Sequence, residues 1–201
     1  DDNITVEIEG FTVTFGSALN FNGTEEITFT EDDSQGRAVD SATMAVIVTP
    51  VNDSPVLTDP GPQSTDEDTP LTITLLSSDV ENDDLTYSAE SDNSSVAVSV
   101  SNDQLTMTPS LNFNGSSNIT VTVSDGFLTD ASSFALTINA VNDAPTIVLP
   151  ESFTFSEDGS LEKDFASYID DIDGDALFLT ASGDDNITVE IEGFTVTFGS
   201  A

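Results

Sequence analysis

The same eighteen residues, DDNITVEIEGFTVTFGSA, occur at positions 1–18 and again at 184–201. A stretch of this length does not recur letter for letter by chance. It indicates a window on a longer tandem array with a period of 183 residues. Such a window opens inside one domain and closes just past the same place in the next copy. The fold must therefore be one whose units can be joined end to end.

A second, weaker repeat divides this period. LNFNG occurs at 19–23 and at 111–115, and VNDSP at 51–55 returns as VNDAP at 141–145. The two offsets, 92 and 90 residues, differ because TEDDSQGRAVDSA is longer than its counterpart VSDGFLTDASS. We therefore expect units of about 90 residues. The expected units are the C-terminal part of one domain (1–52), a complete domain (53–142) and the N-terminal part of the next (143–201).

Within a unit, apolar residues alternate with Thr, Ser and other small or polar residues, which is the period of a β-strand. The breaks between runs consist of Asp, Asn, Gly, Pro and Ser. About seven strands in 90 residues are typical of an immunoglobulin-like β-sandwich, so the predicted fold class is all-β. After a first strand near PVLTDP, the predicted strands of the complete unit are 71–76, 85–90, 96–101, 105–110, 119–124 and 134–139.

The two end segments are predicted to be partial sandwiches. Residues 1–52 carry strands four to seven, and 143–201 carry strands one to five. The segment 4–15 is predicted to be a hairpin that turns at Glu9–Gly10, and the only candidate helix is a turn near 165–170. Partial sandwiches expose unpaired strand edges. They are therefore either a slice of a continuous fibre, which we favour, or they are completed head to tail by neighbouring chains.

The chain is strongly acidic, with 38 Asp and Glu against two basic residues and a formal net charge of −36. Phosphate binding needs clustered Lys and Arg, so nucleic acid is excluded as a partner, and anionic membrane surfaces are disfavoured. No apolar run approaches the 18 residues of a membrane span. Three interpretations of the acidic residues stay open: they bind a metal, they adapt the surface to high salt, or they form a solvated face without a further role.

Cysteine, histidine and tryptophan are absent. Disulfides, thiolate chemistry and imidazole zinc sites are therefore excluded. Paired carboxylates can hydrolyse glycosides, but a copied array without Trp argues against an enzyme. Only Tyr87 and Tyr168 could serve as aromatic platforms, which weakens the case for carbohydrate binding.

Acidic residues recur at three places in the units. Alternating carboxylates in one tight loop suit a hard cation that takes six to eight oxygens. The loop between the second and third strands carries them in both units: Asp79, Glu81 and Asp83, and then Asp171, Asp173 and Asp175. An EF-hand is excluded because its sixth position holds Asp84 or Ala176 in place of Gly. Glu67 and Glu157 end the first strand, and VND lies at each join.

The motifs VNDAP, EDG, DIDGD, NFNG and VSDG together resemble the cadherin-like tandem repeats of giant bacterial surface proteins and adhesins. This resemblance covers the whole chain and implies cadherin-like sandwiches with Ca²⁺ clamped between successive domains. The implied ligands near residue 142 are Glu67, Asn142, Asp143, Asp171, Asp173 and Asp175. Those near residue 52 are Asn52, Asp53, Asp79, Glu81 and Asp83, and the first-strand Glu of that join lies on the preceding copy, outside this window. Glu157, which matches Glu67 in the following unit, is a further candidate.

Two departures from the cadherin pattern matter. The Asp-Arg-Glu motif before the sixth strand is missing, and NFNG replaces it with the neutral oxygens of Asn112 and Asn114. We expect NFNG to be structural, with Phe113 and Phe21 at the bottom of the core. TEDDS at 30–34 also replaces VSDG, so the ligand sets of the two joins are expected to differ.

Taken together, the sequence predicts a secreted, non-catalytic cell-surface repeat. Its units form an extension rod that Ca²⁺ stiffens and that holds a distal binding module away from the cell, as in adhesion or biofilm proteins. Its expected partners are calcium and neighbouring repeats of the same protein. Two alternatives stay open: a repeat subunit of an extracellular filament or sheath, and a polysaccharide-binding module.

Overall fold

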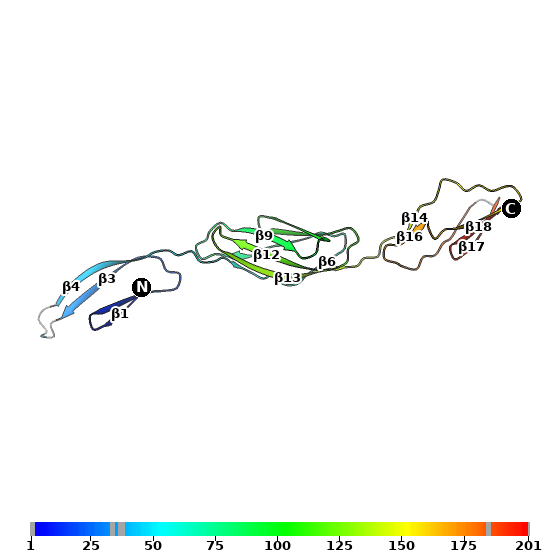
Figure 1. Cartoon of the computed structure of the whole chain (residues 1–201). Helices are drawn as coiled ribbons and strands as arrows, with labels where there is room; N and C mark the ends of the chain where they lie inside the picture. Colours follow the sequence, from blue (N-terminus) through cyan, green and yellow to red (C-terminus); the bar gives the residue numbers. More distant parts are fainter. Residues whose placement is uncertain (1–2, 33–34, 36–38, 184–185, 201) are drawn as a thin grey trace.

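The computed structural model describes residues 3–32, 35, 39–183 and 186–200, and every regular element among them is a β-strand. The all-β prediction is therefore confirmed. The strands form three groups in a row: an N-terminal part, a central sandwich and a C-terminal part (Figure 1). None of the described residues forms a helix that could cross a membrane.

The central sandwich consists of two main sheets. One has the strand order β10-β11-β7, the other β6-β13-β12-β9, and the short strands β5 and β8 pair beside them. The strands are β5 (Val56–Leu57), β6 (Gln63–Asp66), β7 (Leu71–Thr74), β8 (Ser77–Ser78), β9 (Thr86–Ser91), β10 (Val96–Ser101), β11 (Gln104–Pro109), β12 (Gly115–Ser124) and β13 (Thr129–Asn139).

All six predicted runs of this unit lie on strands, but the first predicted strand is divided in two. Its first half, β5, pairs with β8, and its second half, β6, runs parallel to β13. The break follows Asp59-Pro60-Gly61, where Gly61 has φ 67°, so the chain crosses from one sheet to the other at this turn. The expected unit bounds of 53 and 142 stay a prediction.

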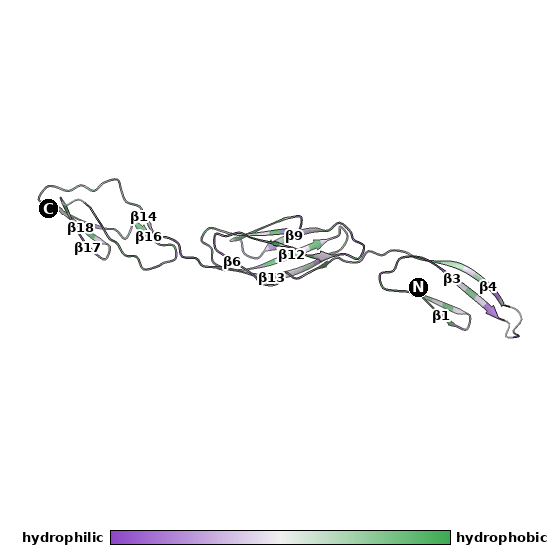
Figure 2. Cartoon of the chain, turned by 180° about the vertical axis from the view of Figure 1, so that it is seen from behind, coloured by the Kyte–Doolittle hydropathy of each residue, from purple (hydrophilic) through white to green (hydrophobic). Residues whose placement is uncertain are grey.

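The core lies between the two main sheets and follows from the alternation in the sequence. Leu105, Met107, Ile119, Val121 and Leu136 are fully buried, while the residues between them face outward or are part-buried. Burying one such side chain contributes about 1.5–3 kcal/mol. Figure 2 shows the apolar residues of β12 as green segments.

The NFNG motif forms the turn that leads into β12. Asn112 adopts φ 54° and Gly115 φ 141°, and the Phe113 side chain packs against the core. The first copy of the motif has the same backbone, with φ 60° at Asn20 and φ 145° at Gly23. These contacts agree with the expected structural role of the motif.

The N-terminal part contains two hairpins, and the first has the duplicated sequence. Its strands are β1 (Ile4–Glu9), β2 (Thr12–Ser17), β3 (Gly23–Asp32) and β4 (Val39–Val48). The predicted turn at Glu9–Gly10 is one residue too early, because Glu9 pairs with Thr12 and the turn is Gly10–Phe11. Gly10 makes this turn possible with φ 63°, a conformation that side chains rarely adopt.

The C-terminal part repeats one sheet of the central sandwich. Its strands are β14 (Thr146–Ile147), β15 (Ser160–Asp164), β16 (Ile169–Asp170), β17 (Ile187–Glu192) and β18 (Thr195–Ser200). The sheet order β15-β18-β17 matches the order β7-β11-β10. The candidate helix near 165–170 is only a turn, in which the Tyr168 N–H donates to the Phe165 carbonyl at 2.9 Å.

The prediction of strands one to five in the C-terminal part is wrong for two segments. The counterpart of β9, residues 178–183, forms no strand, and neither do residues 153–156, the counterpart of β6. In the central sandwich β9 pairs with β12 and β6 pairs with β13. Counterparts of β12 and β13 do not accompany β17 and β18 in the described residues, so these two segments lack the strands that would order them.

Candidate metal centre

Two joints connect the three groups of strands, and each contains a loop of alternating acidic residues. The first joint comprises Asn52 and Asp53 with the loop 79–83. The second comprises Asn142 and Asp143 with the loop 171–175. The loops and linkers match residue for residue, so their contacts can be compared directly.

The first Asp of each loop folds the loop around its own carboxylate. Asp79 Oδ1 accepts from the N–H groups of Glu81 at 3.0 Å and Asp83 at 3.2 Å. In the second loop, Asp171 Oδ1 accepts from the N–H groups of residues 173 and 175, both at 3.1 Å. The left-handed position of each loop is occupied by a residue type that tolerates it, Asn82 with φ 61° and Gly174 with φ 74°.

The linker docks onto each loop through its Asp backbone. The Asp53 N–H donates to Glu81 Oε2 at 3.1 Å, and the Asp143 N–H donates to Asp173 Oδ2 at 2.7 Å. The preceding Asn closes the same turn at both joints: Nδ2 of Asn52 donates to the carbonyl of residue 53 at 3.0 Å, and that of Asn142 to the carbonyl of residue 143 at 2.8 Å. The acidic loops therefore hold the linkers in one repeated arrangement.

Each joint contains a buried carboxylate oxygen without a hydrogen-bond partner, Asp79 Oδ2 at the first and Asp143 Oδ2 at the second. A buried, unpaired anionic oxygen is costly, and a cation is the partner that offsets this cost. Burial raises the pKa of Asp143 above its ordinary value, and the neighbouring Asp173 carboxylate raises it further. Asp68, Glu67 and Asp171 act on Asp143 in the same direction.

Glu67 reaches the second joint from the central sandwich. It is only 4% exposed, and its Oε1 accepts from the Val141 N–H at 2.6 Å. Its own N–H donates to the Asn139 carbonyl at 2.9 Å. Glu67 therefore lies beside the linker of the second joint. Glu157, its counterpart in the C-terminal part, is exposed.

The donors at both joints are the hard oxygens that Ca²⁺ prefers, so the residues fit this ion chemically. Across the described part of the chain, however, no three acidic side chains lie close enough together to form a ready-made metal site. For the carboxylates of one joint to share an ion, their side chains would have to reorient.

Asp125 is a joint residue that the sequence did not single out. It is 8% exposed, and its Oδ1 accepts from the N–H groups of Phe127 and Leu128, both at 2.6 Å. Its Oδ2 accepts from Asn52 Nδ2 at 2.8 Å, and this bond is the main cause that lowers the pKa of Asp125. The sequence feature that could have identified Asp125 is the VSDG motif, because this motif is part of the resemblance to cadherin-like repeats, but no role was assigned to its Asp.

The counterpart of VSDG in the N-terminal part is TEDDS, whose Asp33 and Ser34 lie outside the described residues.

Asp68 is a second residue near the joints that the sequence did not single out. Its Oδ1 accepts from the Asn112 N–H at 2.8 Å, which ties the NFNG turn to the second joint. The neutral NFNG motif thus contacts the acidic region through its backbone.

Comparisons with known proteins cover the central sandwich and its neighbours. Residues 51–139 match the family model of the cadherin-like domain, and no curated protein sequence matches the chain. The chain is similar to human protocadherin-24 EC1-2 form II, with 18% identity, a TM-score of 0.49, and coverage of 68% of this chain and 76% of that one.

The chain is also similar to an endo-fucoidan hydrolase of glycoside hydrolase family 107, with 20% identity and a TM-score of 0.37. That likeness covers 100% of this chain and 33% of the hydrolase, so the chain spans about a third of its length.

Proposed function

We propose that this chain, whose residues 51–139 form a cadherin-like domain, is a non-catalytic segment of an extracellular extension rod that Ca²⁺ stiffens at its joints. The rod would hold a distal binding module away from the cell surface. One observation carries the proposal: the Asp143 carboxylate has a buried oxygen without a partner, among four further carboxylates that raise its pKa.

At the second joint the proposed ligands come from three segments: the central sandwich, the linker and the following loop. They are Glu67, Asn142, Asp143, Asp171, Asp173 and Asp175. At the first joint they are Asn52, Asp53, Asp79, Glu81 and Asp83. Bound Ca²⁺ would neutralise the clustered carboxylates and bridge the two units that supply them.

The chain's own contacts prepare the joint for this role. The hydrogen bond from the Asp143 N–H to Asp173 already fixes the linker on the following loop. The bond from the Val141 N–H to Glu67 fixes the same linker on the preceding sandwich. Two carboxylates from different units thus hold Val141 and Asp143, so Asn142 alone lies between the two fixed points of the linker.

The test uses the full chain with calcium or with a chelator at matched ionic strength. Because the ion would bind the folded state, stability should rise with its concentration, by about 2.7 kcal/mol at a hundredfold excess over Kd. We expect calcium to raise the melting temperature. In small-angle scattering we expect calcium to increase the maximum dimension of the particle and to narrow the spread of its conformations. Equivalent sodium should do neither.

A pair of double variants with the same loss of charge separates a joint effect from a surface effect. Asp171→Asn with Asp173→Asn removes two proposed ligands, whereas Glu162→Gln with Glu190→Gln changes two exposed residues of the same part. We expect the first variant to lose most of the calcium response and the second to keep it. An equal response of both variants, or an equal response to sodium, would reject the calcium joint.

A filament subunit is a second candidate, favoured by a specific feature of the C-terminal part. There, the large apolar side chains of Ile172, Phe178 and Ile187 are exposed. Exposed apolar surface of this kind marks an interaction site. Ordered fibres formed by the isolated chain would support this candidate, and a chain that stays unassociated would contradict it.

A further inference from the structure

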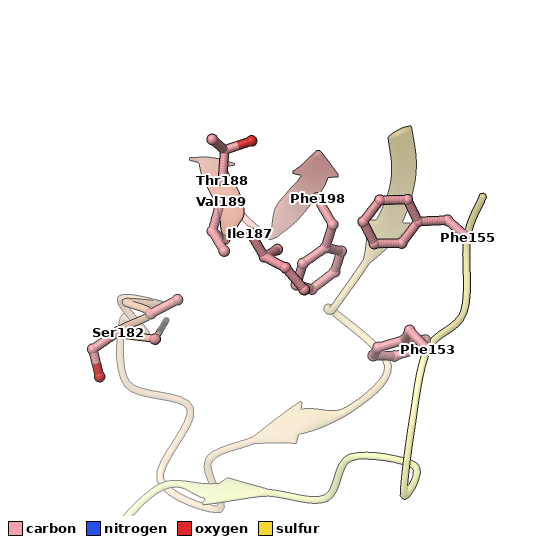
Figure 3. A pocket seen from close by; sticks show the side chains of 9 residues that line it. Phe153, Phe155, Ser182, Ile187, Thr188, Val189 and Phe198 are labelled. Atoms are coloured by element: carbon pink, nitrogen blue, oxygen red, sulfur yellow. The ribbon is translucent and has the colours of Figure 1, made fainter. Parts of the chain in front are cut away.

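Apolar side chains gather at the surface in two kinds of place. One is a hollow of about 690 Å³ in the C-terminal part, where Phe198 and Ile187 of the β17–β18 hairpin lie between Phe153 and Ser182 (Figure 3). All the residues that line this hollow belong to the C-terminal part, so it does not connect two units. The other kind of place is the joint, where exposed apolar side chains come from the units on both sides.

Three sequence positions supply an exposed apolar side chain at each joint. They are the Leu of LNFNG, the Val of VND and the second residue of the acidic loop. These residues are Leu19, Val51 and Val80 at the first joint, and Leu111, Val141 and Ile172 at the second, and each of them is exposed. The recurrence of all three positions links the exposed side chains to the joints.

Leu111 shows most clearly that this exposure is a feature of the joint. Its side chain is 83% exposed although both sheets of its own sandwich are in place, and two residues further on Phe113 packs against the core. The main sheets face outward with paired hydroxyl groups, such as those of Thr72 and Thr106 at 2.9 Å. Scattered exposed apolar residues need no explanation, whereas a set concentrated at one place indicates a contact.

Leu111 and Ile172 approach the second joint from opposite units. The N–H of the residue after Leu111 donates to Asp68 Oδ1 at 2.8 Å, and Asp68 is close enough to Asp143 to raise its pKa. The residue after Ile172 is Asp173, whose Oδ2 accepts from the Asp143 N–H at 2.7 Å. Each apolar side chain is therefore attached beside a group that acts on the same linker residue.

The first joint has the same arrangement. Val80 lies in the acidic loop on which the linker docks through the bond from the Asp53 N–H to Glu81. The turn between β2 and β3, which contains Leu19, lies at the end of the N-terminal part that faces the central sandwich (Figure 1). Phe127, in the loop between β12 and β13, adds a further exposed apolar side chain to the first joint.

We propose that each joint has a closed state in which the Leu of LNFNG packs on the apolar residue of the following acidic loop, Leu19 on Val80 and Leu111 on Ile172. The joints are open in the structure, since all four side chains are exposed. Removing these side chains from water favours closure, and the repulsion between the clustered carboxylates opposes it.

This closed state goes beyond the calcium rod, because the contact between the apolar side chains needs no ion. It gives successive units an attraction of their own, which acts in one direction of bending. Any agent that reduces the repulsion between the carboxylates, including a monovalent salt, shifts the joint toward the closed state.

Two cysteines in the full chain can trap the closed state, since the sequence contains none. A disulfide needs Cβ atoms about 3.5–4.5 Å apart, so it reports contact between the two side chains. The double variant Leu111→Cys with Ile172→Cys is oxidised mildly at low protein concentration, and the loss of free thiols is measured in the monomer. The buffer contains chelator, and about 0.5 M NaCl to screen the carboxylates.

The matched control combines Leu111→Cys with Phe178→Cys. Phe178 is an apolar residue of the same unit and is more exposed than Ile172, 92% against 62%, so chance encounters favour the control. At the first joint the test pair is Leu19→Cys with Val80→Cys, and the control replaces Val80→Cys by Thr86→Cys, the counterpart of Phe178.

We expect each test pair to form at least about tenfold more intramolecular disulfide than its control. Equal yields of test pair and control at a joint would overturn the proposal for that joint. Every sample contains chelator, so this result does not depend on calcium binding. A chain without a calcium response could still form the disulfide, and a chain with one could fail to form it, so the two proposals can fail separately.

Discussion

The N–H group of Asp143 donates a 2.7 Å hydrogen bond to Oδ2 of Asp173, while the Oδ2 of Asp143 itself is buried without a partner. The backbone of this residue therefore fixes the linker on the loop, and its side chain adds an uncompensated negative charge at the same place. The joint is well ordered in its backbone and unfavourable in its electrostatics. A cation would remove the second feature without disturbing the first.

This combination predicts that Asp143→Asn has opposite effects with and without calcium. In chelator the amide removes a buried charge among other carboxylates, so the melting temperature should rise. In calcium it removes a ligand, so the stabilisation by calcium should shrink. Scanning calorimetry of the full chain measures both. Glu192→Gln, an exposed change of the same charge, should alter neither; a variant that behaves alike in both buffers would contradict the joint as a calcium site.

The raised pKa of Asp143 predicts a pH dependence in the chelated protein. A carboxyl group whose pKa is higher in the folded state binds more protons when folded, so stability falls as pH rises from the ordinary value of 3.8 through the raised one. Above that range the loss is constant. Melting temperatures in chelator across this range should show a decline that Asp143→Asn reduces. An unchanged pH profile in the variant would mean that other carboxylates cause the decline.

At the first joint the sign is reversed, because the pKa of Asp125 is lowered, chiefly by the bond from Asn52. Its contribution to stability is present above the ordinary value of 3.8 and is lost as pH falls through the lowered one. We expect Asn52→Ala to raise the pKa of Asp125 toward its ordinary value, as carboxyl NMR titration would show. Asn142→Ala serves as the control, and a shift of Asp125 in that variant would contradict a direct role of Asn52.

The strands of the central sandwich were predictable because each one buries alternate side chains. Val96, Leu105 and Met107 are buried at the positions that the period of two indicates. Such alternation is a local property, so it can be read from one segment alone. The turn of the first hairpin was misplaced by one residue because Glu9 and Thr12 extend the alternation up to Gly10.

What the sequence could not supply were relationships between distant segments. Residues 178–183 have the composition of a strand, but a strand needs a neighbour, and the neighbour of their counterpart β9 is β12. The role of Asp125 likewise depends on Asn52, which lies 73 positions away. The paired acidic loops were found because they repeat in sequence, and their role as calcium ligands stays a prediction.

The turn before β12 gives a test of the fold itself. Gly115 has φ 141°, a backbone that is almost closed to other residues, and an added Cβ would lie 3.4 Å from the Phe113 ring. Gly61, with φ 67°, has nothing within 4 Å of an added Cβ. Gly115→Ala should therefore destabilise the sandwich by about 3 kcal/mol, and Gly61→Ala by about 1 kcal/mol. Urea unfolding of both variants measures the difference. An equal loss of unfolding free energy in the two variants would show that the NFNG turn adjusts to the added methyl group without strain. It would also show that Phe113 is not held against the core as the structure places it.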